Sequence, residues 1–361
     1  MRPEDYTSPA VFERERERIF RRLWLFAGLE MMVARPNAYY ARRLAGVPIL
    51  LQNTEGTIGA FVNACAHRGA LVQDDGIGVR PAACAYHGWK YAADGSVDRI
   101  PFETQHYRFT SEQRACLRLQ PLALRSVGQF LFVNFSSAPM PIEAQYDPSV
   151  LSDLEGMSAY FDTDVVMGTA TSRFNWKLAG ENLRDALHPS FVHPKTMNPH
   201  YEFPIERYPT PRTDIASLPA ASFGGAEGIA KSDRAWPWWE QLERWPAATD
   251  EYYNWLLFPN VHIASADGCR TFGIEQYDPI APDTTCLHHM MLTARRRERI
   301  PHGHAILRTM MRSARAVLDE DARILEKAQS GAVAGAPSYA HGEYEGHVKH
   351  FEKVYRGLLD E

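Results

Sequence analysis

The 361-residue chain has no run of about 18 consecutive apolar residues, the length that a membrane-spanning helix needs. It also lacks a long basic block, and its formal net charge is −5. The first absence argues against a transmembrane segment and the second against a nucleic-acid partner. Residues 12–22 (FERERERIFRR) form a charged run instead of an apolar signal-peptide core. We therefore expect a soluble, cytoplasmic protein.

Cysteine is scarce as well. The chain has five, and we expect Cys116, Cys269 and Cys286 to be reduced, buried and inert. A Gly-rich dinucleotide-binding fingerprint is also missing. Any electrons from a nicotinamide cofactor would therefore have to arrive through a separate protein.

Two short segments each supply one thiolate and one imidazole. They read C-A-H at residues 65–67 and C-A-Y-H at residues 84–87, which gives the ligand set Cys65, His67, Cys84 and His87. Two Cys and two His suit a Rieske [2Fe–2S] cluster, in which the thiolates hold one iron and the imidazoles the other. A structural zinc ion accepts the same set, but zinc modules usually bring the two cysteines together in one loop. The mixed loops favour the [2Fe–2S] cluster.

The loop-like run SSAPMP at residues 136–141 is the best domain boundary. Before it we expect strands at 49–52, 57–63 and 127–135, with turns at Glu55-Gly56 and Asp94-Gly95. After it we expect helices at 174–188, 303–329 and 341–359, and strands at 256–264, 270–278 and 285–294. Strands followed by long helices indicate an α+β fold. The predicted segments are a helical arm (1–22), a β domain (23–138) and a second domain (139–361).

A second group of metal-ligand side chains lies in the later domain. His188 and His193 are five residues apart, which on one unbroken helix would turn them about 140° away from each other. Pro189 disfavours helical geometry at His188 and removes a backbone N–H, so the helix should end or bend there. Both imidazoles could then reach one ion. The alternative is an ordinary surface or core pair of histidines.

A carboxylate would complete a two-histidine, one-carboxylate site for non-heme Fe(II). The helix expected at 303–329 carries an apolar stripe with a spacing of three and four, made of Met310, Ala314, Val317, Ile324 and Ala328. Asp321 falls on this stripe, whereas Asp319 and Glu320 fall off it. Because a buried carboxylate needs a metal or a paired cation, Asp321 is the predicted third ligand, and pairing with an arginine is the alternative.

The first loop continues into Arg68-Gly69 and the second into Gly-Trp-Lys-Tyr at residues 88–91. With these flanks the segment resembles the Rieske domain of the ring-hydroxylating, or Rieske non-heme iron, oxygenases, although that family usually has Pro where this chain has Ala85. The resemblance covers nearly the whole chain. It implies an all-β Rieske [2Fe–2S] domain plus a helix-grip-like catalytic domain, in which an antiparallel sheet wraps around a long C-terminal helix and holds a mononuclear Fe(II).

Asp185 and Asn182 are the predicted catalytic residues beside the second site. A carboxylate three residues before His188 can accept a hydrogen bond from the imidazole and fix its tautomer. In the resembled family this Asp also reaches a Rieske histidine of the neighbouring subunit, here His87, so that a trimer joins the two metals. The alternative for Asp185 is a bond to His188 without any bridging role. The resemblance places Asn182 near the iron.

The resemblance implies a terminal oxygenase (α) component, which uses O2 and electrons from a separate NAD(P)H reductase, with or without a ferredoxin. Such an enzyme hydroxylates or dihydroxylates a small organic substrate, with aromatic hydrocarbon catabolism as the expected setting. Monooxygenation of N-methyl or O-methyl groups, or of a quaternary ammonium compound, is the alternative. We expect a homotrimer, with an additional β subunit as the other arrangement. An electron carrier without catalytic iron would leave roughly 220 residues unexplained. A scaffold with a degenerate second site is disfavoured by the intact His188, His193 and Asp321.

Tryptophan clusters in one part of the second domain, at positions Trp236, Trp238, Trp239, Trp245 and Trp255. These side chains could include an aromatic cage for a cationic substrate, or they could fill the core. The pattern alone favours the core.

Overall fold

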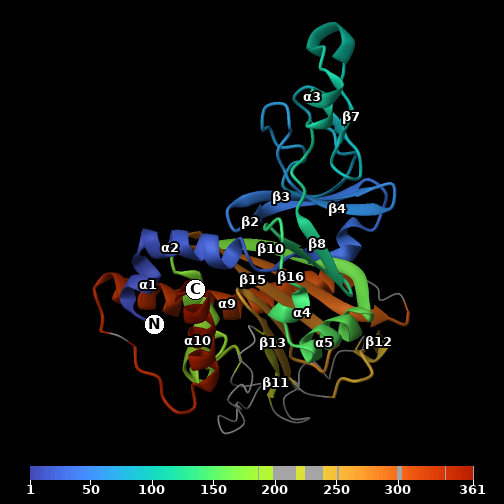
Figure 1. Ribbon diagram of the computed structural model, residues 1–361. Helices are drawn as coiled ribbons and strands as arrows, with labels where there is room; N and C mark the ends of the chain where they lie inside the picture. The colour runs from blue at the N-terminus through green and yellow to red at the C-terminus, as the bar shows by residue number, and fades with distance from the viewer. Residues whose placement is uncertain are drawn as a thin grey trace. The chain divides into compact units, whose positions relative to one another are not determined.

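The computed structural model describes residues 1–185, 187–197, 217–223, 239–249, 252–298, 303–337 and 339–360. It divides into two compact units (Figure 1). Unit 1 comprises Met1–Ile19 and Pro141–Glu361, and unit 2 comprises Phe20–Met140. These limits lie close to those drawn from the sequence, and the N-terminal arm belongs to the same unit as the C-terminal domain.

Unit 2 consists of small antiparallel sheets, with strand orders β1-β9-β8, β4-β3-β2-β5 and β6-β7. The strands are β1 (Leu25–Leu29), β2 (Ala38–Leu44), β3 (Val47–Thr54), β4 (Thr57–Val62), β5 (Gly76–Val79), β6 (Lys90–Tyr91), β7 (Val97–Arg99), β8 (Ala123–Val127) and β9 (Phe130–Asn134). Short helical segments are η2 (Glu30–Val33), η3 (Glu103–Tyr107) and α3 (Ser111–Ala115).

Two-residue turns set the register of the four-stranded sheet. Ala45 and Gly46 join β2 to β3, and Glu55 and Gly56 join β3 to β4; φ is positive at all four residues. Two consecutive left-handed residues make a turn whose twist matches that of the paired strands. The predicted turn at 94–95 likewise joins β6 to β7.

Unit 1 is built on a seven-stranded antiparallel sheet with the path β10-β16-β15-β14-β13-β11 and with β12 paired to β16. Its strands are β10 (Phe161–Ser172), β11 (Ser217–Phe223), β12 (Leu242–Glu243), β13 (Tyr252–Leu257), β14 (Val261–Ser265), β15 (Thr271–Ala281) and β16 (Thr284–Arg296). The helical segments are α1 (Pro3–Thr7), α2 (Pro9–Glu15), η1 (Arg16–Phe20), α4 (Ile142–Gln145), α5 (Pro148–Ser158), α6 (Trp176–Asn182), α7 (His188–Val192), η6 (Trp239–Gln241), α9 (Gly303–Val333) and α10 (Gly346–Asp360).

The long helix α9 packs against β10 and β16, as expected for a sheet wrapped around a C-terminal helix (Figure 1). Its buried residues include Leu307, Leu318, Asp321, Leu325 and Gln329. The spacing of three, four and seven among these residues defines one helix face. Asp321 is therefore buried as predicted, but the predicted stripe was partly wrong: Ile324 and Ala328 are exposed, because the buried face passes through Leu325 and Gln329 instead.

Two of the predicted strands each proved to be two strands. The segment 127–135 contains the end of β8, a turn at Gly128 with positive φ, and β9. The segment 256–264 contains the end of β13 and most of β14, separated by a turn that includes Pro259. Proline cannot donate a ladder hydrogen bond, so the chain turns there although the flanking residues are apolar.

The predicted helix 174–188 was too long, since α6 ends at Asn182. Arg184 N–H donates to Glu181 O at 3.0 Å and Asp185 N–H to Asn182 O at 3.2 Å. These tighter bonds end α6 before α7, which begins at His188 and has Pro189 in its first turn. The expectation for Cys116 was also wrong: it is exposed at the end of α3, whereas Cys269 is buried.

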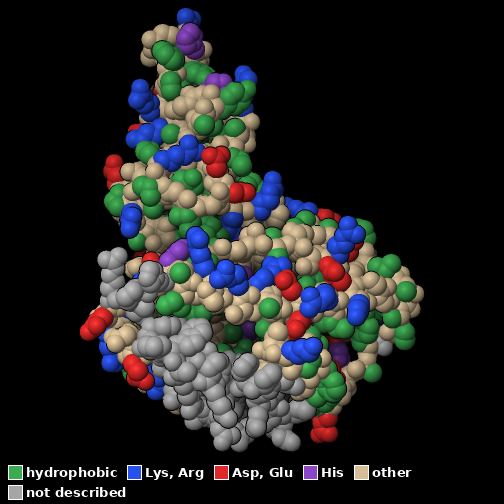
Figure 2. Space-filling view, turned by 180° about the vertical axis from the view of Figure 1, so that it is seen from behind, with side chains coloured by type: hydrophobic (Ala, Val, Ile, Leu, Met, Phe, Trp, Pro, Cys, Tyr) green, Lys and Arg blue, Asp and Glu red, His purple; other side chains and the backbone are tan. Residues whose placement is uncertain are grey.

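Charged side chains of both signs are interspersed with hydrophobic ones on the described part of the face in Figure 2. Histidine side chains, shown in purple, reach the surface of unit 2 at the top of that view. None of the described helices combines the length and apolarity needed to cross a membrane.

Candidate metal centres

The two Cys/His loops of unit 2 have matching backbone geometry. Gly69 N–H donates to Cys65 O at 2.8 Å, and Gly88 N–H donates to Cys84 O at 2.9 Å. Both glycines have φ near +70°, a conformation that side chains rarely adopt. Each loop therefore folds into a tight turn that presents its thiol and its imidazole together.

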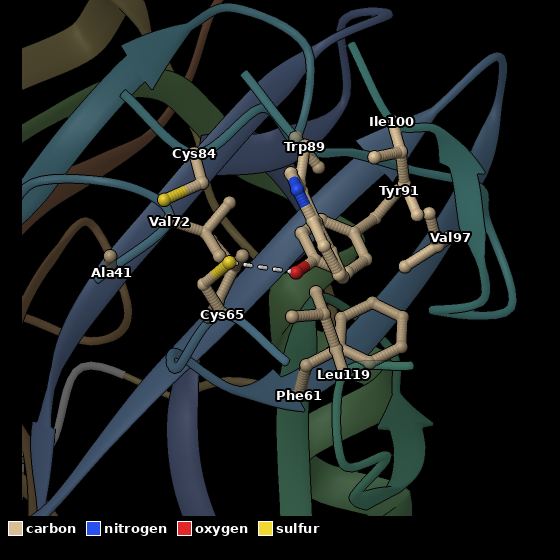
Figure 3. Close-up of a cluster of buried hydrophobic side chains, with 12 residues drawn as sticks. Ala41, Phe61, Cys65, Val72, Cys84, Trp89, Tyr91, Val97, Ile100 and Leu119 are labelled. Atoms are coloured by element: carbon tan, nitrogen blue, oxygen red, sulfur yellow. Dashed lines mark hydrogen bonds between the residues drawn. The ribbon is translucent and has the colours of Figure 1, made fainter. Parts of the chain in front are cut away.

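The two thiols are buried in the core of unit 2 (Figure 3). The imidazole rings of His67 and His87 lie with their centroids 4.6 Å apart. His67 also stacks on Trp89 at 4.8 Å, and its Nδ1 is buried without a hydrogen-bond partner within the described part of the chain. A buried nitrogen without a partner fits a metal ligand, so the geometry suits a [2Fe–2S] cluster.

The chemistry of the surrounding groups agrees with metal ligation. Burial, followed by the positive charges of His87 and Arg68, lowers the pKa of His67, which keeps a nitrogen lone pair available. Burial and the neighbouring Cys65 raise the pKa of the Cys84 thiol. A coordinated metal cation reverses this shift by stabilising the thiolate. The Tyr91 hydroxyl donates to Cys65 Sγ at 3.0 Å (Figure 3).

The second predicted group comes together in unit 1. His188, His193 and Asp321 each offer a ligand atom, and these atoms lie within 4.8 Å of one another. His193 Nε2 is 3.1 Å and His188 Nε2 is 3.7 Å from Asp321 Oδ1. The short helix α7 supplies the two imidazoles at or next to its ends, and α9 supplies the carboxylate. The three side chains can hold one metal ion with coordination positions left open.

Two neighbouring side chains orient these ligands. The Asn182 amide donates to Asp321 Oδ1 at 3.0 Å and lies 3.5 Å from His188 Nε2. His193 Nδ1 is 2.8 Å from Glu320 Oε2, which also accepts from Thr196 Oγ1 at 2.5 Å. Asn182 was expected near the iron. Glu320 and Thr196 were missed, and the signal for Glu320 was its position directly before the ligand carboxylate on the helix.

Asp185 contacts His188 through its backbone. The Asp185 carbonyl oxygen is 2.7 Å from His188 Nδ1, whereas its carboxylate is 4.0 Å away. The carboxylate instead accepts from Leu187 N–H at 2.8 Å. The expected bond from the carboxylate to the imidazole is therefore replaced by one to the carbonyl, because the chain has left the helix by Asp185. The remaining carboxylate of the predicted trio, Asp319, pairs with Arg315 at 2.7 Å.

The pKa values of the two histidines shift in opposite directions. Burial lowers the pKa of His188 although Asp321 and Asp185 oppose the shift. At His193 burial also lowers the pKa, but the bonds and charges of Asp321 and Glu320 outweigh it and raise the pKa overall. His188 is thus neutral and able to bind a metal ion. At His193, a metal ion held beside Asp321 would displace the proton on Nε2.

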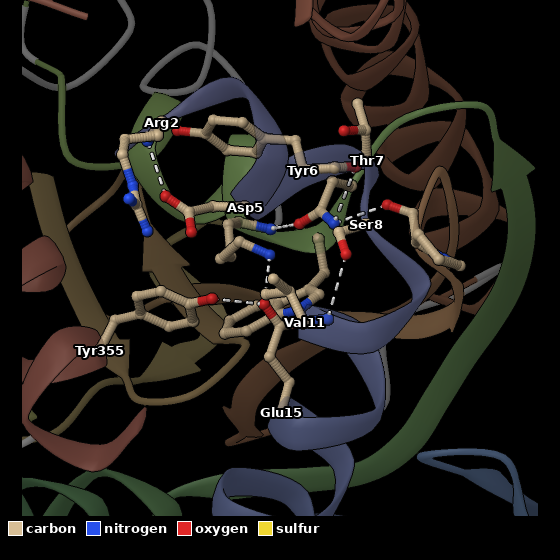
Figure 4. A network of polar contacts seen from close by, with 12 residues as sticks. Arg2, Asp5, Tyr6, Thr7, Ser8, Val11, Glu15 and Tyr355 are labelled. Atoms are coloured by element: carbon tan, nitrogen blue, oxygen red, sulfur yellow. Dashed lines mark hydrogen bonds and ion pairs between the residues drawn. The ribbon is translucent and has the colours of Figure 1, made fainter. Parts of the chain in front are cut away.

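The N-terminal arm supports the start of α6 through a buried polar network (Figure 4). Glu15 accepts from Lys177 Nζ at 2.5 Å, from Tyr355 at 2.6 Å and from Trp176 Nε1 at 2.9 Å. Gln329 of α9 accepts a hydrogen bond from the backbone N–H of Asn175 at 3.0 Å. The arm and α9 therefore fix the helix that ends in Asn182.

The described tryptophans favour the core. Trp255 is fully buried, stacks on Tyr253 at 5.2 Å and donates to Asp153 of α5 at 3.0 Å. Trp245 packs against Gly156 of the same helix. Trp236 and Trp238, and the side chain of Trp239, lie outside the described residues.

Family models match both halves of the chain. The Rieske [2Fe-2S] domain matches residues 24–119, and the ring hydroxylating alpha subunit (catalytic domain) matches residues 159–361, more than half of the chain. The chain belongs to the ring-hydroxylating alpha subunits. As a ring-hydroxylating alpha subunit it carries a Rieske [2Fe–2S] cluster and a mononuclear iron, and the donor sets described above fit both groups.

Curated relatives of this alpha subunit are similar over part of their length. The glycine betaine monooxygenase oxygenase subunit of Chromohalobacter salexigens is 32% identical over 204 residues, 55% of this chain and 44% of the relative. The large oxygenase component of the naphthalene 1,2-dioxygenase system of Pseudomonas aeruginosa is 28% identical over 193 residues, 52% of this chain and 43% of the relative. The matches thus span less than half the length of these relatives.

Solved structures match the fold over the whole alpha subunit. A quaternary ammonium Rieske monooxygenase gives a TM-score of 0.80 at 19% identity and covers 99% of this chain and 94% of that one. Naphthalene 1,2-dioxygenase with bound indole gives 0.72 at 18% identity and covers 100% and 92%. At this identity the likeness establishes the two-domain fold alone.

Proposed function

We propose that the protein is the terminal oxygenase component of a Rieske oxygenase system, which hydroxylates or dihydroxylates a small organic substrate. The observation that carries the proposal is the two-histidine, one-carboxylate set in unit 1, in a chain whose unit 2 holds the Cys/His loops. When bound, the two metal centres supply the electrons and the O2 activation that hydroxylation requires. A separate reductase, directly or through a ferredoxin, is the electron source.

In this proposal Cys65, His67, Cys84 and His87 hold the cluster, and His188, His193 and Asp321 hold the mononuclear iron. Asn182 orients Asp321 through its amide, and the Asp185 carbonyl fixes the His188 tautomer so that Nε2 faces the ion. Glu320 does the same for His193.

We further propose a homotrimer in which Asp185 connects the mononuclear iron of one subunit with the cluster of the next. Asp185 supports this role because its carbonyl holds His188 while its half-buried carboxylate bonds only a neighbouring N–H among the described residues. The matching quaternary ammonium Rieske monooxygenase is described as revealing inter-subunit electron transfer in that protein.

A quaternary ammonium compound is the second candidate for the substrate. Two of the relatives above, a glycine betaine monooxygenase subunit and a quaternary ammonium monooxygenase, bear names that point to such compounds. Trp255 is buried in the core and the half-buried Trp245 packs against α5, so the proposal rests on these relatives alone.

Iron analysis combined with a substitution tests the function. The wild-type protein should bind three irons per chain, and Asp321→Ala should bind two, keep the Rieske absorption spectrum and form no product. The ligands of the two centres lie in different units, so the cluster should be unaffected. Two irons in the wild type would instead indicate an electron carrier, and full activity of Asp321→Ala would refute the assigned ligand.

A further inference from the structure

A row of polar side chains crosses the sheet of unit 1. His262 of β14 is the register partner of Glu275 of β15, which in turn is the partner of His289 of β16. Side chains of register partners emerge on the same face of a sheet, side by side. Their exposed fractions are only 5%, 8% and 3%, so the row is buried although all three groups are polar.

The row lies on the sheet face that α9 covers. Tyr277 follows Glu275 by two residues on β15 and therefore points to the same face. It lines a small cavity together with Asp321 and Leu318 of α9. The Tyr277 hydroxyl also donates to Glu275 Oε2 at 2.9 Å. Tyr277 thus connects the row to the cavity that the proposed iron ligand lines.

Hydrogen bonding within the row is incomplete. His262 Nδ1 is 3.0 Å from Glu275 Oε2, so this bond and that of Tyr277 end on the same oxygen. His262 Nε2 and both ring nitrogens of His289 are buried and have no partner in the part of the chain that the structure describes. Unpartnered buried polar groups are rare because each is unfavourable. Three of them in one row, which Tyr277 connects to the cavity, indicate a ligand.

Two glycines leave space around His289. Gly168 is its register partner on β10, and a Cβ placed there would meet no atom within 4 Å. A Cβ at Gly273, which precedes Glu275 by two residues, would lie 3.6 Å from His289 Nε2. The space beside Gly168 is open, and a side chain at Gly273 would touch the imidazole, so the two glycines leave room around His289 for a small molecule.

The electrostatics of the row favour a ligand that donates hydrogen bonds. Burial raises the pKa of Glu275, but the facing imidazoles of His262 and His289 and the Tyr277 hydroxyl lower it overall, which keeps the carboxylate ionised. Burial lowers the pKa of His289 and keeps its ring neutral. The row therefore offers the charge of the Glu275 carboxylate and one nitrogen lone pair of the neutral His289 ring, whose other nitrogen carries a hydrogen.

We propose that His262, Glu275 and His289 bind a hydrogen-bond-donating group of the substrate, an ammonium N–H or a hydroxyl O–H, beside the mononuclear iron site. This proposal rests on the proposed oxygenase function and narrows its substrate to small amines or alcohols. In this proposal the row holds the polar group of the substrate. Unsubstituted hydrocarbons would leave the row unpaired and bind weakly.

Equilibrium dialysis of the metal-loaded enzyme with four probes of one ring size tests this proposal. Toluene has no polar group, benzyl alcohol and benzylamine carry donors, and benzyltrimethylammonium carries charge without N–H. Benzylamine or benzyl alcohol should bind at least about tenfold more tightly than toluene and benzyltrimethylammonium. Glu275→Gln and His289→Phe should each weaken the binding of benzylamine and benzyl alcohol by about tenfold and leave toluene binding unchanged.

The matched control is His288→Phe, since His288 is the next residue on β16 and points to the opposite face. It should bind all four probes as the wild type does. Toluene or the quaternary ammonium probe binding as tightly as benzylamine would overturn the proposal. So would an unchanged preference in both row variants with normal metal content. A separate experiment measures O2 uptake in the presence of a reductase. If the probes bind but no substrate stimulates O2 uptake, the proposed oxygenase function is wrong and the binding proposal still stands.

Discussion

At the residue scale, the groups next to the metal ligands set the properties of each centre. Tyr91 donates its hydroxyl to Cys65 Sγ and accepts from Ala66 N–H at 2.9 Å, so its position is fixed from two sides. Glu320 fixes His193 in a comparable way, with Thr196 as its second partner. These contacts lie outside the ligand sets and can be altered without removing a ligand.

The Tyr91 bond should raise the reduction potential of the cluster, because reduction adds negative charge that a donor to sulfur stabilises. Tyr91→Phe removes one hydrogen bond of about 1 kcal/mol, so the potential should fall by on the order of 40 mV. Redox titration followed by EPR measures the change. Tyr86→Phe is the control, since Tyr86 is 61% exposed in the second loop and should leave the potential unchanged. Equal potentials for Tyr91→Phe and wild type would show that the bond has no electronic effect.

Glu320→Gln should weaken iron binding at the mononuclear site by roughly 10- to 100-fold, because the charge that holds the His193 N–H is lost. Competition with a chelator measures this affinity. Asp319→Asn is the matched control: it is the adjacent acid, it is partly exposed, and it pairs with Arg315 away from the ligands. If both variants lost iron equally, the effect would come from the charge of the helix and not from the contact with His193.

At the element scale, the boundaries of α6 and α7 explain how far the sequence could be interpreted. Ligand types and loop spacing pointed to the residues that the structure brings together, because each is a local pattern. The apolar stripe predicted the burial of Asp321, although its member Ile324 is exposed. The end of α6 at Asn182 was not predictable from Pro189, since it depends on contacts with α9 more than a hundred residues away. The row on β14, β15 and β16 was missed for the same reason: register between strands is a tertiary property.

The buried pair of Glu15 and Lys177 should be important for the stability of unit 1. Both side chains are 0% exposed, so Glu15→Ala leaves an uncompensated ammonium in the core. We expect a loss of about 3–5 kcal/mol in the free energy of unfolding, measured by urea denaturation. Glu13→Ala on the same helix removes an exposed pair with Arg16 and should lose less than about 1 kcal/mol. Similar losses in both variants would contradict the role of the buried network.

At the scale of the whole molecule, the two units carry different metal centres, and the proposed function requires electrons to pass between these centres. The proposed trimer supplies the route, with Asp185 as the residue between the centres. Family membership and fold were confirmed by the comparisons. The assembly and the substrate depend on surfaces between chains and on the shape of a cavity, which a single sequence does not encode in any local pattern.

Asp185→Asn tests the route. The amide oxygen of Asn can still accept from Leu187 N–H, and the backbone carbonyl that contacts His188 is unchanged, so the local turn should persist. The variant should keep both metals and the trimer, yet oxidise its reduced cluster roughly tenfold or more slowly with substrate and O2 present. Stopped-flow absorbance measures this rate. Wild-type rates in the variant, or full activity in a verified monomer, would rule out the inter-subunit route.

The contact between His193 and Glu320 joins residues 127 positions apart in the chain. An iron ion held by His193 and by Asp321 is therefore a reversible crosslink between two distant segments, present only in the folded state. Each tenfold excess of free Fe(II) over its dissociation constant should add about 1.4 kcal/mol to the stability of unit 1. Calorimetry across an iron series should show one melting transition that moves with Fe(II), while the loss of cluster absorbance stays fixed. The stability of folded unit 1 then depends on the concentration of free Fe(II) as well as on the amino-acid sequence.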